Sequence, residues 1–419
     1  MRFIHAADIH LDSPLRGLGS YEDMPVDILR SASRAAFTRL VEEAIALEVD
    51  FMVIAGDLYD GDWKDHNTGI YFARQMGRLR NAGIPVYVLH GNHDAESVMT
   101  KRLALPDTVH VFGARKPVTF VLPQLKVALH GQSFPHAAVT DNLAASYPDP
   151  LPGHFNIGVL HTALEGYAEH AHYAPCSVEQ LQARGYQYWA LGHVHEFRIF
   201  PGPVPVVFPG NLQGRHIREQ GARGAVLVSC SEGEVQSIER LEVDVVRWHR
   251  LEVDANRCES WNDALARVRS GLASVLSEQA DDRPRVLRIS LQGGTDLHGE
   301  LVARREQLRA DVQAIMAALA GERLWLEKLQ VATQHPAGNV TSAGVDADDL
   351  STLLAEAIAD DSFHDGLRQG LQPLLDRAPY ELAGQVPVLE ALREGRVEGL
   401  LSDAAAAVLG RLDRAGKGS

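Results

Sequence analysis

The chain of 419 residues is poor in cysteine, with only Cys176, Cys230 and Cys258. These cysteines are far apart and form no CxxC pair, so we expect neither a disulfide scaffold nor a zinc–thiolate site. No uninterrupted apolar run approaches the ~18–20 residues of a membrane span. The start, Met1–His5, soon reaches Asp8 and does not resemble a secretory signal peptide. These absences predict a cytoplasmic protein with no membrane partner.

Positive charge is scarce relative to negative charge. Lys and Arg number 40 and Asp and Glu number 55, so the formal net charge is −15. Binding of nucleic acid through bulk charge requires a basic face, so this composition excludes that class of protein but leaves room for a local basic patch. With 45% hydrophobic and 23% charged residues, the composition is that of an ordinary globular protein, and the length suggests two or three domains.

The first half of the chain predicts an α/β fold. Short apolar runs alternate there with helical stretches, and we expect five of the runs to be buried strands: Arg2–Ala7, Phe51–Ala55, Val86–His90, Asn156–Leu160 and Tyr188–Leu191. Further strands are expected at Lys126–His130 and Ala225–Cys230, and an amphipathic crossover helix at Leu29–Glu48.

Polar side chains follow each of the five predicted strands. They include seven residues of metal-ligand type, namely Asp8, His10, Asp57, Asn92, His161, His193 and His195. Fifteen of the 19 histidines lie at or before His216, so the first half of the chain is where metal chemistry is to be sought. Open α/β sheets bind ligands at the carboxyl ends of their strands, so we expect one shared site.

The predicted ligands favour two divalent metal ions. Their donor atoms are oxygen and imidazole nitrogen, which suit manganese, iron or zinc better than copper(I). One metal needs only three or four ligands, whereas seven are available. A carboxylate such as Asp57 could bridge the two groups. Two cations about 3.5–4 Å apart can clamp a phosphate ester for in-line attack.

The second half of the chain has a different pattern. Residues 244–335 predict a small α+β domain, with strands at Trp248–Val253, Arg285–Gln292 and Leu324–Ala332 and helices at Trp261–Glu278 and Glu300–Leu319. A linker with proline and glycine follows, and residues 336–419 predict short helices with 14 acidic and 7 basic residues. We therefore divide the chain into 1–243, 244–335 and 336–419.

The blocks together resemble the calcineurin-like metallophosphoesterases. The details resemble the branch of DNA double-strand-break repair nucleases that includes bacterial SbcD and the YhaO-like exonucleases. The resembling text is Phe3–Asp12, Gly56–Asp60, Gly91–Asp94, Gly192–His195, Pro209–Asn211 and Gly214–His216. The resemblance is strong over about 1–240. Over the second domain it is weaker and mostly concerns the layout of the predicted elements, and over 336–419 it is faint. It implies a metallophosphoesterase β-sandwich flanked by helices, with a small α+β capping domain.

The resemblance also implies a role for each ligand. Asp8, His10 and His195 would hold one metal, Asn92, His161 and His193 the other, and Asp57 would bridge them. The metals would most simply be Mn²⁺, with iron, zinc or magnesium as alternatives, and His93 would face the scissile phosphate. The implied activity is that of a DNA exonuclease. In the family the C-terminal helices dock on an SMC-like ABC ATPase, but this chain has a short acidic end in place of the typical long basic tail.

Several residues keep two interpretations. Asp94 could orient His93 for catalysis or cap a helix. Arg215, Arg218 and Arg223 could contact DNA phosphates or form a solvated loop. Tyr59, with Asp62 and Trp63, could stack on a base or pack against the Val26–Glu48 region. The remaining histidines near the blocks are expected to be structural or surface residues, namely His5, His66, His90, His130 and His172.

Two rival functions stay open from the sequence. A phosphoesterase for a small molecule or a phosphoprotein could use the same metal core without any dependence on DNA. A scaffold subunit with a vestigial site is a second rival, which the complete ligand set opposes. A homodimer is possible in any of these cases.

Overall fold

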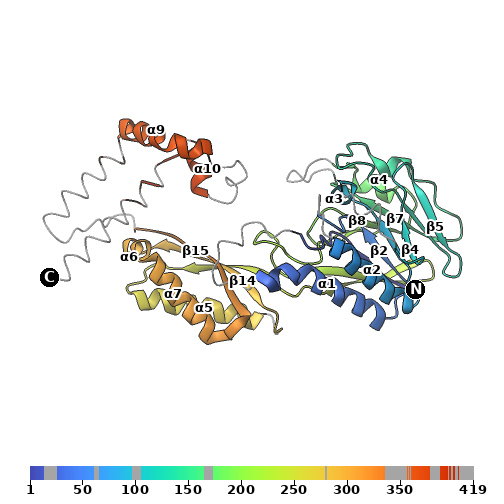
Figure 1. The fold of residues 1–419 in the computed structure, drawn as a ribbon, viewed down its shortest axis with the longest axis horizontal. Coiled ribbons are helices and arrows are strands. Elements are labelled where there is room, and N and C mark those ends of the chain that lie inside the picture. The colour runs from blue at the N-terminus through green and yellow to red at the C-terminus, as the bar shows by residue number, and fades with distance from the viewer. Residues whose placement is uncertain are drawn as a thin grey trace. The chain divides into compact units, whose positions relative to one another are not determined.

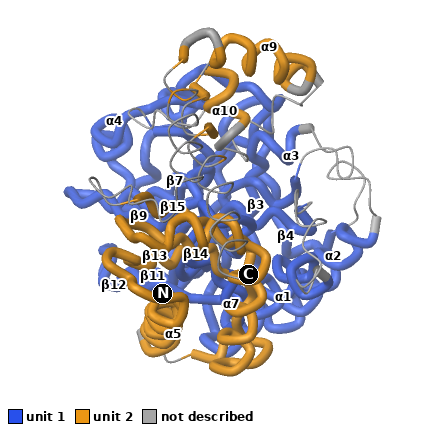
Figure 2. Tube along the Cα trace, turned by 90° about the vertical axis from the view of Figure 1, so that its left-hand side faces the viewer, with its two compact units in different colours: residues 1–249, 283–286 blue, residues 250–282, 287–419 orange. Residues whose placement is uncertain are grey.

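A computed structural model describes most of the chain (Figure 1). The described residues are 1–13, 26–60, 66–96, 105–164, 173–278, 281–335, 356, 358, 360–377, 387–394, 396–397, 400–401 and 404. They divide into two compact units, one of residues 1–249 and 283–286 and one of residues 250–282 and 287–419 (Figure 2). The proposed division into three domains stays a prediction. In the described part of the chain, no helix is long and apolar enough to cross a membrane.

The first unit contains two six-stranded sheets. The first sheet has the order β12-β11-β1-β2-β3-β4, with bounds Glu234–Glu242, Gly224–Ser231, Arg2–Ala6, Phe51–Ala55, Val86–Leu89 and Val109–Val111. The second has the order β5-β6-β7-β8-β10-β9, with bounds Val118–Leu122, Val127–Gly131, Phe155–His161, Tyr188–Gly192, Val206–Phe208 and Arg198–Phe200. Strands β1, β2 and β3 are parallel neighbours, and so are β7 and β8.

Apolar side chains hold the two sheets together. One buried cluster combines Phe3 and Val53 of the first sheet with Val127 and Ile157 of the second. These central strands are buried on both faces, which explains why they are nearly continuous apolar runs in the sequence.

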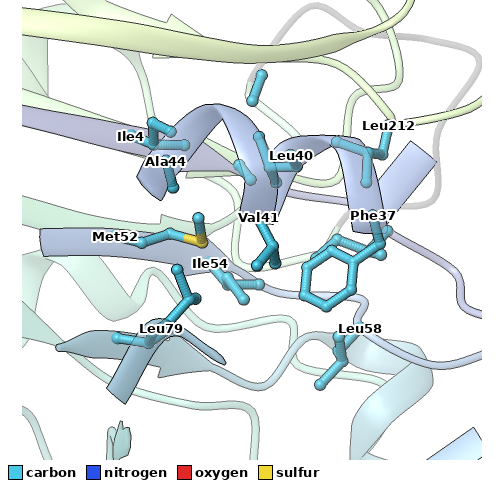
Figure 3. Close-up of a cluster of buried hydrophobic side chains, with 14 of the residues drawn as sticks. Ile4, Phe37, Leu40, Val41, Ala44, Met52, Ile54, Leu58, Leu79 and Leu212 are labelled. Carbon is cyan, nitrogen blue, oxygen red and sulfur yellow. The ribbon is translucent and has the colours of Figure 1, made fainter. Parts of the chain in front are cut away.

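Helices cover the outer face of the first sheet. They are α1 (Val26–Ala46) and α2 (His66–Asn81), and their buried faces form a second cluster with the strands. In Figure 3, Phe37 and Leu40 of α1 lie over Met52 and Ile54 of β2. Shorter elements complete the unit: α3 (Asn92–Glu96), the 3-10 helix η2 (Leu143–Ser146) and α4 (Val178–Gln182). Two sheets flanked by helices confirm the predicted α/β sandwich.

The second unit contains the predicted α+β elements. Its three-stranded sheet has the order β13-β14-β15, with bounds Arg247–Asp254, Arg285–Gly294 and Leu324–Gln334. Helix α5 (Trp261–Glu278) forms as expected, but the helix predicted at Glu300–Leu319 is divided into α6 (His298–Ala303) and α7 (Arg305–Ala320). The break lies at Arg304, which leaves the helical region with φ −112° and ψ 32°. A short 3-10 helix, η3 (Gly321–Arg323), leads into β15.

The C-terminal part contains two described helices, α9 (Asp361–Arg377) and α10 (Pro387–Arg393), which contact each other. Leu350, Leu353 and Leu354, in the segment predicted to form short helices, lie outside the described residues.

Candidate metal centre

The parallel strands bring the predicted ligands to one edge of each sheet. Asp8 and His10 follow β1, Asp57 follows β2, and Asn92 begins α3 directly after β3. From the other sheet, His161 ends β7, and His193 and His195 follow β8. Because the two sheets pack together through a shared apolar cluster, these edges meet, and His195 comes within 3.9 Å of Asp8.

The donor atoms form two groups. Within each group, one ligand atom from every residue lies within 4.8 Å of the others; the first group is Asp8, His10 and His195, and the second is Asp57, His161 and His193. The amide of Asn92 belongs beside the second group, because its Oδ1 is 2.9 Å from His161 Nε2. Oxygen and imidazole nitrogen in two sets of three or four donors fit two divalent cations.

Asp57 lies between the two groups. Its Oδ2 is 3.9 Å from His10 Nε2 in the first group and 3.4 Å from His161 Nε2 in the second. Its Oδ1 accepts a hydrogen bond from the backbone N–H of His93 at 3.1 Å. One carboxylate therefore reaches both groups and also fixes the start of α3.

Hydrogen bonds at the outer ring nitrogens orient two of the histidines. His161 Nδ1 donates to the carbonyl of Ala55 at 3.0 Å, so Nε2 is directed at Asp57 and Asn92. His195 Nδ1 donates to Glu219 Oε1 at 2.7 Å, and its Nε2 faces His10 Nε2 at 3.2 Å. Both rings thus direct Nε2 into the site.

The pKa values show how strongly these groups interact. Burial raises the pKa of Asp8 to about 6, and burial lowers the pKa of His10 to about 3. For Asp57 burial opposes ionisation, yet His161 and His10 hold its pKa well below the usual range. Burial likewise opposes protonation of His161, but the charge of Asp57 raises its pKa to about 9. The cluster is a concentrated set of ionisable ligands that a cation would satisfy.

The backbone of the ligand loops is strained. Asp8, His10, Asp57 and His193 all have positive φ, at 50°, 45°, 52° and 104°. L-residues seldom adopt this region, and such strain tends to concentrate at functional sites.

A neighbouring glycine lets the ligand loops approach closely. A Cβ on Gly91 would lie 2.4 Å from Asp57 Oδ1 and 2.8 Å from His161 Cε1, so a side chain at this position would displace the carboxylate of Asp57.

His93 lies beside the two groups and is 40% exposed. Its Nδ1 is 3.1 Å from Asp60 Oδ1, which makes Asp60 the carboxylate that orients it. This role of Asp60 was not predicted from the sequence, although Asp60 lies in the block Gly56–Asp60. Ser13 donates to Asp60 at 2.5 Å, and the surrounding hydrogen bonds hold the pKa of Asp60 low despite burial.

The contacts of Asp94 favour the structural one of its two interpretations. Its two oxygens accept from the backbone N–H groups of Leu58, Tyr59 and Gly91 at 2.9–3.1 Å. Asp94 therefore ties the loop after β2 to the start of α3, which is the structural alternative, and burial raises its pKa.

The three arginines occupy different environments. Arg223 is only 6% exposed and donates to the carbonyls of His195 and Gln220 and to Asn211 Oδ1, so its environment does not favour a contact with DNA. Arg215 is half-buried in the wall of the site, and Arg218 is exposed.

The structure also shows the environments of Tyr59 and of the histidines that were expected to be structural or surface residues. Tyr59 packs on Phe72 of α2 in the apolar cluster, so it is not a stacking platform, and Asp62 and Trp63 lie outside the described residues. His5 bonds to Tyr188 and Leu191, and His130 bonds to Thr119 and Asn156. His90 is half-buried, while the side chain of His66 and all of His172 lie outside the described part.

Two family models match the chain. Residues 1–197 match the calcineurin-like phosphoesterases, and residues 248–334 match the middle domain of metallophosphoesterase YhaO. A relative in Bacillus subtilis, an uncharacterized metallophosphoesterase YhaO, is 31% identical over 84% of this chain and 89% of its own length. The chain belongs to the calcineurin-like metallophosphoesterase family. It is therefore a metal-dependent phosphoesterase, and divalent metal ions are its cofactors.

Two further relatives carry functional names. The SbcD component of the nuclease SbcCD from Escherichia coli is 25% identical over 92% of this chain and 99% of its own length. The DNA double-strand break repair protein Mre11 from Methanopyrus kandleri is 29% identical over 71% of this chain and 69% of its own length. These relatives support the predicted branch of the family, that of the DNA repair nucleases.

Proposed function

We propose that the protein is a two-metal DNA exonuclease that hydrolyses phosphodiester bonds in DNA repair. The observation that carries this proposal is the position of Asp57 Oδ2 between His10 and His161, with His93 alongside. The names of the relatives, a nuclease component and a double-strand break repair protein, support DNA as the substrate.

In this proposal Asp8, His10 and His195 hold one cation and Asn92, His161 and His193 the other, with Asp57 shared. The cations, of which Mn²⁺ suits this mixed oxygen and nitrogen set, would supply Lewis-acid activation of the phosphate and of the attacking water. The assignment of each ligand rests on the two groups of donor atoms described above.

His93 is the proposed catalytic acid. Its ring is accessible at the site, and Asp60 accepts the Nδ1–H, so Nε2 is directed away from that carboxylate. A histidine held in this manner can protonate the departing oxygen of the phosphodiester. The carboxylate of Asp60 therefore orients the ring of His93.

Contacts with DNA outside the metal centre are proposed for few residues. Arg218 is exposed on the loop that follows β10 and can meet a phosphate, whereas Arg223 cannot.

An SMC-like ATPase is the proposed protein partner, because two relatives are a nuclease component and a break-repair protein. The second unit is proposed as the capping domain.

The experiment compares substrates directly. The purified protein with Mn²⁺ is given end-labelled single-stranded and double-stranded DNA, bis-p-nitrophenyl phosphate and p-nitrophenyl phosphate. We expect progressive shortening of DNA and cleavage of the diester. Cleavage of the monoester without any cleavage of DNA would show that the substrate is a small molecule or a phosphoprotein.

A further inference from the structure

His195 is held from both edges of its ring. On one edge Nε2 faces the first donor group, with His10 Nε2 at 3.2 Å and Asp8 Oδ1 at 3.9 Å. On the other edge Nδ1 lies 2.7 Å from Glu219 Oε1. Because a carboxylate only accepts hydrogen bonds, the ring proton of the neutral imidazole belongs on Nδ1 and the lone pair on Nε2.

Glu219 is itself fixed by several donors and is only 5% exposed. Besides His195, its oxygens accept from Asn211 Nδ2 at 3.0 Å, from the backbone N–H of Arg215 at 2.7 Å and from Arg215 Nη2 at 3.2 Å. A carboxylate with this many partners has a defined position, so it can impose a defined position on the imidazole.

We propose that Glu219 is a positioning residue for His195. It fixes the tautomer and the orientation of the ring so that Nε2 is available to a divalent cation. This inference rests on the proposed function, in which His195 is a metal ligand. Outer carboxylates of this kind typically change metal affinity by ~10–100-fold when they are removed.

Arg215 extends the same network to the other side of the site. Its Nη1 is 3.3 Å from Ser13 Oγ and 3.7 Å from Asp60 Oδ2, the carboxylate group that orients His93. One guanidinium therefore contacts the carboxylate behind the metal ligand and the carboxylate behind the catalytic histidine. With its two Nη groups engaged inside the site, Arg215 acts as a link between these carboxylates rather than as a DNA contact.

The test titrates metal-free protein with Mn²⁺ by calorimetry and compares the native chain with Glu219→Gln, Glu219→Ala and His195→Gln. Glutamine keeps the size and one acceptor oxygen, whereas alanine leaves four N–H groups without their acceptor. We expect one of two binding events to weaken by ~10–100-fold in Glu219→Ala and by less in Glu219→Gln. Glu196→Gln is the matched control, because Glu196 adjoins His195 but its exposed carboxylate lies near Arg198.

A second readout needs neither metal nor activity. Nitrogen-15 spectra of histidine-labelled, metal-free protein report the tautomer of His195, identified by the signal that His195→Gln removes. We expect the Nδ1–H form in the native chain and a mixture in both Glu219 variants. If Glu219→Ala does not fold, as judged by its thermal midpoint, the metal affinity and the spectrum of Glu219→Gln show whether Glu219 positions His195.

The outcomes separate the two proposals. If His195→Gln loses one metal while both Glu219 variants bind two as tightly as the native chain with an unchanged tautomer, Glu219 does not position His195 and the ligand set stands. If His195→Gln still binds two metals with native affinity, the ligand assignment fails and the inference on Glu219 fails with it.

Discussion

At the scale of single residues, the contacts of Asp57 distinguish it from the other ligands. It reaches His10 and His161 with one oxygen, and the other accepts the N–H of His93. Because Asp57 contacts both donor groups, its loss affects both of them at once.

Asp57→Asn should therefore abolish cleavage and reduce the metal content from near two per chain towards one or none. The substitution keeps the size of the side chain but removes the charge that two adjacent cations would share, so their mutual repulsion is no longer offset. Metal content is measured by plasma emission after dialysis. A variant with two metals and native activity would contradict the bridging role.

His93→Ala should retain both metals and lose turnover by about 10²–10⁴-fold, the usual contribution of general acid–base catalysis. Asp60→Asn should reduce turnover less, because His93 remains but its tautomer and orientation are no longer fixed by a carboxylate.

The double variant tests whether the two residues act together. If Asp60 works through His93, then His93→Ala combined with Asp60→Asn is no slower than His93→Ala alone. Two losses that multiply would mean that Asp60 has an independent role, and loss of metal from His93→Ala would make His93 a ligand.

At the scale of secondary structure, the sequence predicted the elements that carry strong periodicity or continuous apolar runs. Strands β1, β2 and β3 follow from such runs, and so does the position of the ligands after them. The short strands β9 and β10 were not predicted, since three residues provide too little pattern. The break at Arg304 was missed because the apolar spacing continues across it.

The missed functional residues have a common cause. Glu219 lies 24 residues from His195 and Asp60 lies 33 residues from His93, so no local pattern connects either pair. The spacing Gly56-Asp57-x-x-Asp60 was visible in the sequence, but only the fold brings that carboxylate to the histidine. The same limit applies to Arg223, whose partners Asn211 and Gln220 are identified only by the packed loop.

His5 in β1 connects the two sheets, and its burial predicts a dependence of stability on pH. It bonds to Tyr188 of β8, and burial lowers its pKa from 6.5 to about 3. Between these values the unfolded chain binds a proton that the folded chain does not. The free energy of unfolding therefore decreases as pH falls below about 6.5, by up to about 1.4 kcal/mol per pH unit.

His5→Gln removes this titration while it keeps a polar group beside Tyr188. The variant should be less stable at pH 7, and its deficit relative to the native chain should shrink at pH 5. Urea unfolding in EDTA, followed by circular dichroism, measures both midpoints. An equal deficit at the two pH values would show that His5 is not responsible.

At the scale of the whole molecule, the catalytic and acidic parts are separate in the sequence. All seven proposed ligands lie between Asp8 and His195, in the first compact unit. Residues 336–419 contribute 14 acidic and 7 basic residues, so this segment favours a basic protein surface over DNA. The net charge of −15 also implies that DNA binding by the isolated chain is weak and falls with salt.

Deletion of 336–419 should leave cleavage of bis-p-nitrophenyl phosphate and the metal content unchanged but weaken binding to an SMC-like ATPase. Phe363 of helix α9 is 46% exposed. Short helices are only marginally stable unless their apolar side chains are covered. Binding to the purified ATPase is compared for the full and shortened chains by surface plasmon resonance, with Phe363→Ser in the full chain as a milder variant. If the shortened chain loses its metals or does not fold, the segment belongs to the core. If it binds the ATPase as tightly as the full chain, the docking surface lies elsewhere.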